Sequence, residues 1–303
     1  MKRNFQLATG TVFVIPGSLS CLKIKRKNKN QRKSIKMKYD GIVIYSDLDG
    51  TLLDAERKLS KDNMDAINYF ISQGGKFGVA TGRMERTTEI MFPDLKLNVP
   101  SIFFNGAMAY YTNDKKVLFK TIISGDLTSV LKKFISEYPE ICCEINIHGK
   151  AYVFNPNHIL QIQLAREGII VEEARWEDIP GEWIKVLFMG DHGTLEKIKA
   201  DFNKLGRTDL NIVFSEDDIL DIMDKSASKG AALNKLKTIY GEDWRFIVSI
   251  GDNDNDIELV QTADLGIAVG NASPAVKKVS DYIIKDHNTP CIPQVLELLE
   301  AYL

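Results

Sequence analysis

The chain has 303 residues, of which 44% are hydrophobic and 26% charged, so it can form one large globular domain or two moderate ones. No stretch reaches the roughly 18 to 20 uncharged apolar residues that a membrane-spanning helix needs. Beyond residue 38 the chain carries 28 basic and 41 acidic residues, a formal charge of −13, which argues against nucleic acid as the main substrate because a duplex binder usually presents a basic face.

Residues 1–38 form a basic leader, with eleven Lys or Arg and no acid, that we predict to be disordered or a targeting segment. A signal peptide would start at Lys2, but Pro16 interrupts its apolar stretch. An organelle-targeting leader fits the lack of acids, although it would need more Arg. In a third reading Met37 is the natural start, because the first predicted strand follows five residues later. We expect a cytoplasmic protein with reduced thiols, since none of the cysteines has zinc-ligand spacing: Cys21, Cys142, Cys143 and Cys291.

The body begins with short apolar runs that alternate with helical segments. Residues 42–45 are uniformly apolar, as expected for a strand buried on both faces of a parallel sheet. Ser60 then predicts the N-cap of a helix, which ends at Gly74. Second and third strands are predicted at residues 77–80 and 101–104.

The same alternation returns near the C-terminus. A helix is predicted over residues 228–240 and is closed by Gly241. Further strands are predicted at residues 246–250, 265–269 and 282–284. Strands that alternate with helices indicate an α/β fold with a doubly wound, Rossmann-like parallel sheet and right-handed crossovers.

Between residues 122 and 224 the alternation changes, and strands mix with helices in another order. Strands are predicted at 151–154, 184–189 and 211–214, and helices at 126–137 and 194–205. We therefore predict an α+β domain at 122–224 that is inserted into a core formed by residues 39–121 and 225–303.

Polar clusters follow the predicted strands of the core. They are Asp47 to Asp54, Thr81-Gly82-Arg83, Asn105-Gly106 and Gly251 to Asp256. Ligands of open parallel sheets bind beyond the carboxyl ends of the strands, so these clusters should converge. Several carboxylates without His or Cys favour Mg²⁺ over zinc. A calcium loop fails, because starting it at Asp252 puts Ile257 at the required glycine, and starting it at Asp47 puts Leu52 there.

The order of these clusters resembles that of the haloacid dehalogenase superfamily, and the chain looks like a Cof-type phosphatase with a class IIB cap. The resemblance covers about residues 38–303. Its four motifs, in chain order, match Asp47-Leu48-Asp49-Gly50-Thr51, Thr81, Ser228-Lys229-Gly230, and Gly251-Asp252 with Asn255-Asp256. The resemblance implies that residues 122–224 form a specificity cap that closes over the carboxylates and excludes water.

The resemblance also implies roles for the carboxylates. Asp47 would be the nucleophile that attacks phosphorus and forms an aspartyl-phosphate. Asp49 would protonate the leaving alcohol and later deprotonate water. Mg²⁺ would be held by Asp47, the backbone carbonyl of Asp49 and Asp252. Asp256 would support the metal waters or Lys229.

The remaining motif residues would bind phosphate or substrate. Thr81, Lys229 and the backbone amides of Leu48 and Gly82 would stabilise the phosphoryl oxygens. The expectation for the other polar residues is that they orient phosphate or face the substrate: Asn255, Asn105 and Arg83. Thr81 and Lys229 also have structural alternatives. Thr81 could cap the next helix, and Lys229 could be an ordinary surface lysine.

The expected activity is hydrolysis of small phosphomonoesters, namely sugar phosphates, flavin or pyridoxal phosphates, or nucleotides, with no nucleic-acid or membrane partner. The first alternative is a phosphotransferase of the phosphomannomutase type, which would release little phosphate. A receiver domain with a phosphoacceptor aspartate would need neither Asp49 nor the insertion, and a non-catalytic binder would not need both Asp47 and Asp49. The sequence leaves the substrate and the oligomeric state open.

Overall fold

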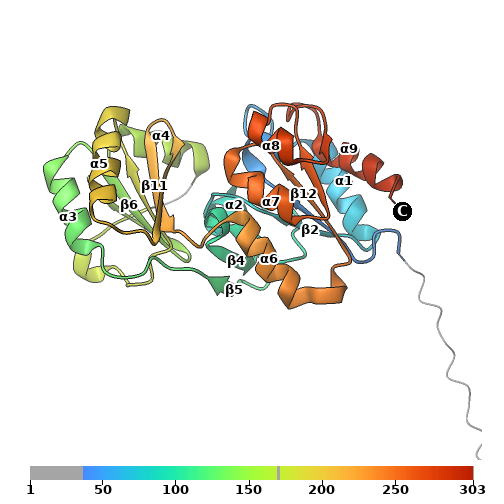
Figure 1. The fold of residues 1–303 in the computed structure, drawn as a ribbon, viewed down its shortest axis with the longest axis horizontal. Coiled ribbons are helices and arrows are strands. Elements are labelled where there is room, and N and C mark those ends of the chain that lie inside the picture. The colour runs from blue at the N-terminus through green and yellow to red at the C-terminus, as the bar shows by residue number, and fades with distance from the viewer. Residues whose placement is uncertain (1–36, 169–170, 303) are drawn as a thin grey trace, which may run out of the picture. The chain divides into compact units, whose positions relative to one another are not determined.

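The computed structural model describes residues 37–168 and 171–302, and the predicted leader lies outside them except for its last two residues. A five-stranded parallel sheet forms the core, in the order β14-β13-β12-β1-β2. Its strands are β1 (Ile42–Ser46), β2 (Lys76–Val79), β12 (Phe246–Gly251), β13 (Leu265–Ala268) and β14 (Tyr282–Ile283). Figure 1 labels β2 and β12 of this sheet. The predicted α/β class with a parallel sheet is confirmed.

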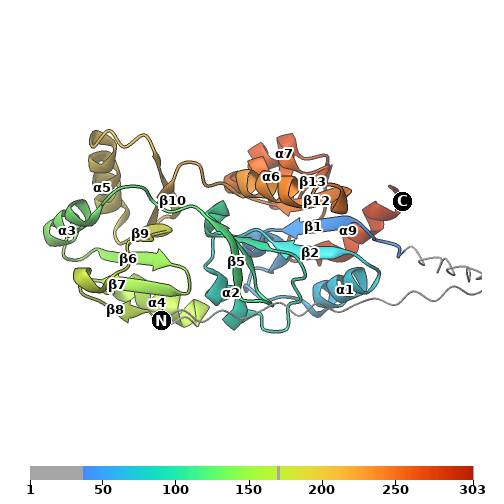
Figure 2. The same ribbon diagram turned by 90° about the horizontal axis from the view of Figure 1, so that it is seen from below.

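Helices cover both faces of this sheet, which explains why residues 42–45 of its interior strand β1 are apolar. The helices of the core are α1 (Lys61–Ser72), α6 (Lys229–Tyr240), α7 (Ile257–Thr262), α8 (Pro274–Val279) and α9 (Cys291–Glu300). Ile42 and Ile44 of β1 pack in one hydrophobic cluster with α1 and α9, whereas Val43 and Tyr45 pack in another with α6 and α7. Figure 2 shows α6 and α7 on the side of the sheet opposite to α1.

The predicted third strand differs from the expectation. β3 (Ser101–Phe103) pairs antiparallel with β4 (Met108–Tyr111), which in turn pairs with β5 (Lys116–Lys120). β3 touches the parallel sheet through one bridge, between Ala80 and Ile102. The short helix α2 (Glu85–Met91) lies between β2 and β3 in the chain.

A second sheet has six strands in the order β10-β11-β9-β6-β7-β8. Its strands are β6 (Cys142–Ile147), β7 (Lys150–Phe154), β8 (Glu172–Glu173), β9 (Lys185–Met189), β10 (Leu210–Glu216) and β11 (Ile219–Asp224). Neighbours pair antiparallel except for β7 and β8. The predicted strands and helices of this region are all present, and the α+β character expected there is confirmed.

Helices pack on both faces of the second sheet. They are α3 (Thr128–Glu137), α4 (His158–Glu167) and α5 (His192–Lys204). Leu131 and Phe134 of α3 and Ile198 and Phe202 of α5 share one hydrophobic cluster with the sheet, whereas Leu160 of α4 belongs to another. Within the described residues, no helix is long and apolar enough to cross a membrane.

Candidate active site at the carboxyl end of the parallel sheet

The chain makes a wide turn directly after β1. Asp47 follows the strand, and residues 48–52 form the turn, which is closed by the Leu53 amide donating to the Leu48 carbonyl at 2.9 Å. Gly50 adopts φ +74°, and a Cβ there would lie 2.5 Å from Oδ2 of Asp252. Only glycine allows both this backbone conformation and this close approach, so the turn brings the first and the fourth polar cluster together.

Asp47 is paired with a buried lysine. Lys229 is the first residue of α6, where Ser228 accepts a hydrogen bond from Ala231 as N-cap. Its Nζ lies 2.7 Å from Oδ1 of Asp47 and 2.7 Å from Oδ1 of Asp256, and the side chain is 1% exposed. The alternative of a surface lysine is therefore wrong. Burial alone would lower the pKa of Lys229, but the two carboxylates outweigh it and raise that pKa.

The fourth polar cluster, after β12, contributes two carboxylates with different surroundings. Oδ2 of Asp256 accepts from the backbone amides of Asp252 at 3.0 Å and Asn253 at 3.2 Å, while Oδ1 binds Lys229. Both oxygens of Asp256 are thus engaged within the protein. Asp252 accepts one hydrogen bond from Thr51 through Oδ1 at 2.9 Å. The Asp252 carboxylate thus has fewer contacts within the protein than Asp256, which binds Lys229. The metal-binding role of Asp252 and the supporting role of Asp256 stay predictions.

The carboxylates fit a divalent cation. One oxygen from each of Asp47, Asp252 and Asp256 lies within 4.8 Å of the others. Burial raises the pKa of Asp47 well above its usual range, and the neighbouring Asp256 and Asp252 add to the rise. Together with Asp49, four carboxylates face two cations, Lys229 and Arg83, so the formal charge of −2 would be balanced by one divalent ion. Oxygen donors without His or Cys are the set that Mg²⁺ prefers.

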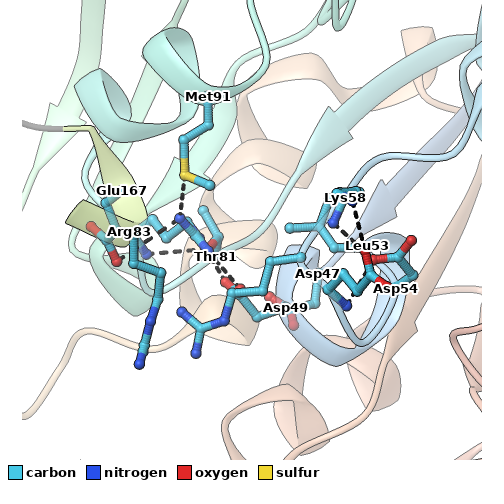
Figure 3. A network of polar contacts seen from close by, with 12 residues as sticks. Asp47, Asp49, Leu53, Asp54, Lys58, Thr81, Arg83, Met91 and Glu167 are labelled. Atoms are coloured by element: carbon cyan, nitrogen blue, oxygen red, sulfur yellow. Dashed lines mark hydrogen bonds and ion pairs between the residues drawn. The ribbon is translucent and has the colours of Figure 1, made fainter. Parts of the chain in front are cut away.

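Asp49 faces an arginine. Nε and Nη2 of Arg83 donate to its two oxygens at 2.7 and 2.6 Å, a bidentate pair that is drawn in Figure 3. Burial would raise the pKa of Asp49, but the hydrogen bonds and charge of Arg83 outweigh it and lower that pKa. Nη1 of the same guanidinium lies 3.9 Å from Oε1 of Glu167, at the end of α4. Arg83 therefore connects the turn after β1 with α4, one of the helices that pack on the second sheet.

The second and third polar clusters lie beside each other. The Thr81 side chain is buried and its hydroxyl accepts from the Arg83 amide at 3.2 Å. It does not cap α2, whose N-cap is Met84, so the capping alternative is wrong. Asn255 donates to Oδ1 of Asn105 at 3.0 Å. These contacts bring the loops after β2, β3 and β12 to one place.

A cavity of about 470 Å³ lies over these loops, a volume suited to a small ligand. Eight of the predicted site residues line it: Asp47, Asp49, Thr81, Gly82, Arg83, Asn105, Asp252 and Asn255. Lys229 and Asp256 lie behind Asp47, while the Leu48 side chain is buried in the core, so Leu48 could serve only through its backbone. Their roles in binding and catalysis remain predictions.

Part of the cavity lining comes from the second sheet and was not predicted from the sequence. Polar residues there include Glu144, Asn146, Lys185 and Asp221, all of which are less than 9% exposed. Their signal in the sequence is a charged or amide side chain within an otherwise apolar strand. That signal is weak, because a polar side chain that faces solvent gives the same sequence pattern as one that faces a cavity.

Three comparisons with known proteins bear on this site. A family model described as haloacid dehalogenase-like hydrolase matches residues 44–296. A pyridoxal phosphate phosphatase of Escherichia coli is 27% identical over 275 residues, which are 84% of this chain and 97% of the relative. A 5-amino-6-(5-phospho-D-ribitylamino)uracil phosphatase of Bacillus subtilis is 24% identical over 79% of this chain and 90% of the relative.

The fold also has counterparts among solved structures. A haloacid dehalogenase-like hydrolase from Bacteroides thetaiotaomicron superposes with a TM-score of 0.78 at 22% identity. The match covers 86% of this chain and all of the other. At this identity the likeness shows a shared fold, which includes both the parallel sheet and the second sheet.

Proposed function

Since the chain belongs to the haloacid dehalogenase-like hydrolases, as its motif order predicted, we propose that it is a Mg²⁺-dependent phosphatase of small phosphomonoesters. The observation that carries the proposal is a pair of aspartates, Asp47 and Asp49, that line one cavity with separate cationic partners, Lys229 and Arg83. Relatives named as phosphatases of pyridoxal phosphate and of a phosphoribitylaminouracil support this class of substrate.

In the first step Asp47 attacks phosphorus with a carboxylate oxygen, and the bond between phosphorus and the ester oxygen breaks. Asp49 gives its proton to the departing alkoxide, which leaves as an alcohol. In the second step water attacks the phosphorylated Asp47, Asp49 takes the proton from that water, and inorganic phosphate leaves. Asp47 is then again a carboxylate, and Asp49 again holds the proton that the next leaving group needs.

The other site residues hold charge and position. Lys229 holds the Asp47 carboxylate in place, and its charge would offset that of the phosphoryl oxygens. Arg83, bound to Asp49 in this structure, would gain an alternative anionic partner when a phosphoryl group binds. Asp49 would then lose the contact that lowers its pKa and could take up the proton that it transfers. A bound Mg²⁺, held by Asp47, the Asp49 carbonyl and Asp252, would supply positive charge at a phosphoryl oxygen and at the attacking carboxylate.

We further propose that residues 122–224 act as the cap of this site. Glu144 and Asn146 of the second sheet line the same cavity as Asp47, so the sheet covers the side from which the alcohol would enter. Such cover excludes water from the phosphoryl step. It also makes a folded phosphoprotein a poor substrate.

Phosphate release from a panel of small phosphomonoesters, with Mg²⁺ and with a chelator, tests the proposal. We expect turnover only with the metal, a loss of about a thousandfold or more in Asp47→Asn, and about 10²- to 10⁴-fold in Asp49→Asn. Asp54→Asn is the matched control, because Asp54 accepts from the amides of Glu56 and Lys58 within its own loop. Turnover that persists in Asp47→Asn contradicts the proposal. Acid-labile phosphate on Asp47 without phosphate release would instead favour the phosphotransferase.

A further inference from the structure

Four buried polar side chains lie on the second sheet and line the cavity over Asp47. Glu144 and Asn146 are on β6, Lys185 is on β9 and Asp221 is on β11. Their exposed fractions are 5%, 3%, 7% and 0%. We call these four residues the polar tetrad.

The strand register places the polar tetrad on one face of three neighbouring strands. Asn146 is paired with Lys185, while Glu144 and Asp221 are both paired with Leu187 from its two sides. Residues that alternate with the tetrad point to the opposite face, where they join the hydrophobic cluster with α3 and α5: Cys143, Ile145, Val186 and Ile222.

The tetrad occupies only half of its own face. Farther along the same strands, Cys142, Met189 and Ile219 alternate in phase with the tetrad and pack in a hydrophobic cluster with Leu160 of α4. Apolar side chains thus fill the half of this face that α4 covers. The other half is polar and lines the cavity. The side chains of this sheet face are therefore apolar where α4 covers them and polar where the cavity lies over them.

The tetrad does not satisfy itself completely. Asn146 donates to Oε1 of Glu144 at 2.8 Å, and Nζ of Lys185 lies 2.6 Å from Oδ2 of Asp221. Nevertheless, neither side-chain oxygen of Asp221 has a hydrogen bond of normal geometry among the described residues, although this side chain is fully buried. A buried carboxyl group costs stability unless its hydrogen bonds are made, so a need of the fold alone does not explain Asp221 on β11, an interior strand of the sheet.

The charges and shapes around the tetrad restrict what it can bind. Two carboxyl groups and one ammonium belong to the tetrad, and Glu167 adds a third carboxyl group to the same cavity. Arg57 and Arg83, which also line the cavity, are already paired with Glu216 and Asp49. A second anionic group on the ligand would therefore be repelled. Phe104 is the one aromatic side chain among the described residues that line the cavity, so a planar ring system would find little to stack on.

We propose that Glu144, Asn146, Lys185 and Asp221 determine specificity by binding the alcohol part of the ester, and that this alcohol is a polyol or sugar, neutral or amino-substituted, without a second negative charge. Hydroxyl groups both donate and accept, so they suit neighbouring carboxylates, amide and ammonium. This inference rests on the proposed phosphatase function. It narrows the substrate class and assigns it to named residues.

The test compares three phosphate esters that share a six-carbon skeleton. Glucose 6-phosphate is neutral in its alcohol part, glucosamine 6-phosphate adds an amine, and 6-phosphogluconate adds a carboxylate. We expect kcat/KM for the first two to exceed that for the third by about a hundredfold, because the third brings a negative charge next to buried carboxylates. Hydrolysis of p-nitrophenyl phosphate measures phosphoryl transfer without a polyol.

Two isosteric variants test the residues themselves. Asp221→Asn and Glu144→Gln should each lower kcat/KM for glucose 6-phosphate about tenfold, mainly through KM, while that for 6-phosphogluconate stays level or rises. The matched control is Glu173→Gln, since Glu173 is an exposed carboxylate on β8 of the same sheet and should leave the discrimination as it is. Thermal unfolding confirms that each variant is folded. The ratio of kcat/KM between glucose 6-phosphate and 6-phosphogluconate in the wild type tests the proposal without any variant.

The outcomes separate this inference from the proposed function. If p-nitrophenyl phosphate and all sugar esters resist hydrolysis, the phosphatase proposal fails and the inference fails with it. If esters are hydrolysed but the carboxylate of 6-phosphogluconate makes no difference, the inference alone is overturned. A loss in Asp221→Asn that is equal for every ester would also overturn it, because a merely structural role predicts that result.

Discussion

Glu144 is a carboxyl group that the fold holds almost completely away from water. Burial raises its pKa to about 7, although the Asn146 amide and the Lys185 ammonium act in the opposite direction. The negative charges of Glu167 and Asp221 add to the rise. In the folded protein this group therefore keeps its proton at pH values where an exposed glutamate has lost it.

This raised pKa predicts how stability depends on pH. The unfolded chain releases the Glu144 proton near pH 4.5 and the folded chain near pH 7, so the contribution of Glu144 to stability falls between these values and then levels off. Glu144→Gln cannot titrate. Its free energy of unfolding relative to wild type should rise by about 3 kcal/mol between pH 4.5 and pH 8, as an upper order of magnitude.

Urea unfolding of both proteins at pH 5 and pH 8 measures this difference. Glu173→Gln, with its exposed side chain on β8, serves as the control and should show no such trend. If the gap between Glu144→Gln and wild type is the same at both pH values, the Glu144 proton is not bound as described.

At the residue scale, the sequence predicted the motif positions but not their pairings. Asp47 and Asp252 follow strands of the parallel sheet, so their convergence follows from topology. The bidentate contact of Arg83 with Asp49 depends on side-chain conformations across 34 positions of chain, which no local pattern encodes. The polar tetrad was missed because its members lie within apolar strands, where only the three-dimensional packing separates a cavity-facing side chain from a solvent-facing one.

The turn between β6 and β7 is held against α2 by a buried carboxylate. Glu85 is 2% exposed, and its Oε1 accepts from the Gly149 amide at 2.7 Å and binds Nδ1 of His148 at 2.8 Å. Arg86 donates to the Gly149 carbonyl at 3.3 Å. One hairpin turn of the second sheet is thus anchored to a helix that follows the second polar cluster.

Removing that carboxylate should loosen the turn. In Glu85→Ala the Gly149 amide loses its acceptor, so we expect its hydrogen exchange to become about tenfold faster or more. Exchange measured by mass spectrometry on peptides that span residues 142–154 would detect this change. Glu85→Gln retains a carbonyl oxygen and should show a smaller effect. Equal exchange in Glu85→Ala and wild type would show that Glu85 does not restrain the turn.

At the element scale, the helices and strands that were predicted with bounds lie within about two residues of the observed ones, because caps and apolar runs are local signals. The elements β6, β11, α2 and α4 had no predicted counterpart. The helix from Ser60 and the helix from Ser228 both begin with these serines as N-caps. The third strand was placed wrongly in the parallel sheet. β3 pairs instead with β4, and β4 pairs with β5. Asn105-Gly106 and Asn113-Asp114 are turn signals of these hairpins, but Asn105-Gly106 was interpreted as a site cluster and no strand was predicted at β4 or β5.

On the scale of the whole molecule, hydrophobic side chains gather in separate clusters. Two clusters draw only on residues between Ile123 and Ile222 and surround the second sheet. The other two surround the parallel sheet, and among the described residues of the inserted region Ile184 alone joins them. A chain with two sets of buried apolar side chains is expected to contain two parts that can each fold.

We therefore predict that residues 122–224 fold when expressed alone. A segment of this length with its own sheet and helices should unfold cooperatively in urea, with a free energy of unfolding of about 5 kcal/mol or more. Circular dichroism during urea titration measures it. A gradual transition without a midpoint would mean that the segment depends on the parallel sheet, and the predicted domain boundaries would need revision.

The alternation of side chains along β6, β9 and β11 also bears on how such a protein can diverge. Asp221 lies in the cavity lining, and its neighbour Ile222 packs in the cluster on the other face. Substitutions at the first position can therefore be selected for a new alcohol without disturbing the packing at the second. A library restricted to positions 144, 146, 185 and 221 would explore ligand preference while leaving the interior of the sheet intact, so descendants of one ancestor can exchange substrates through few mutational steps.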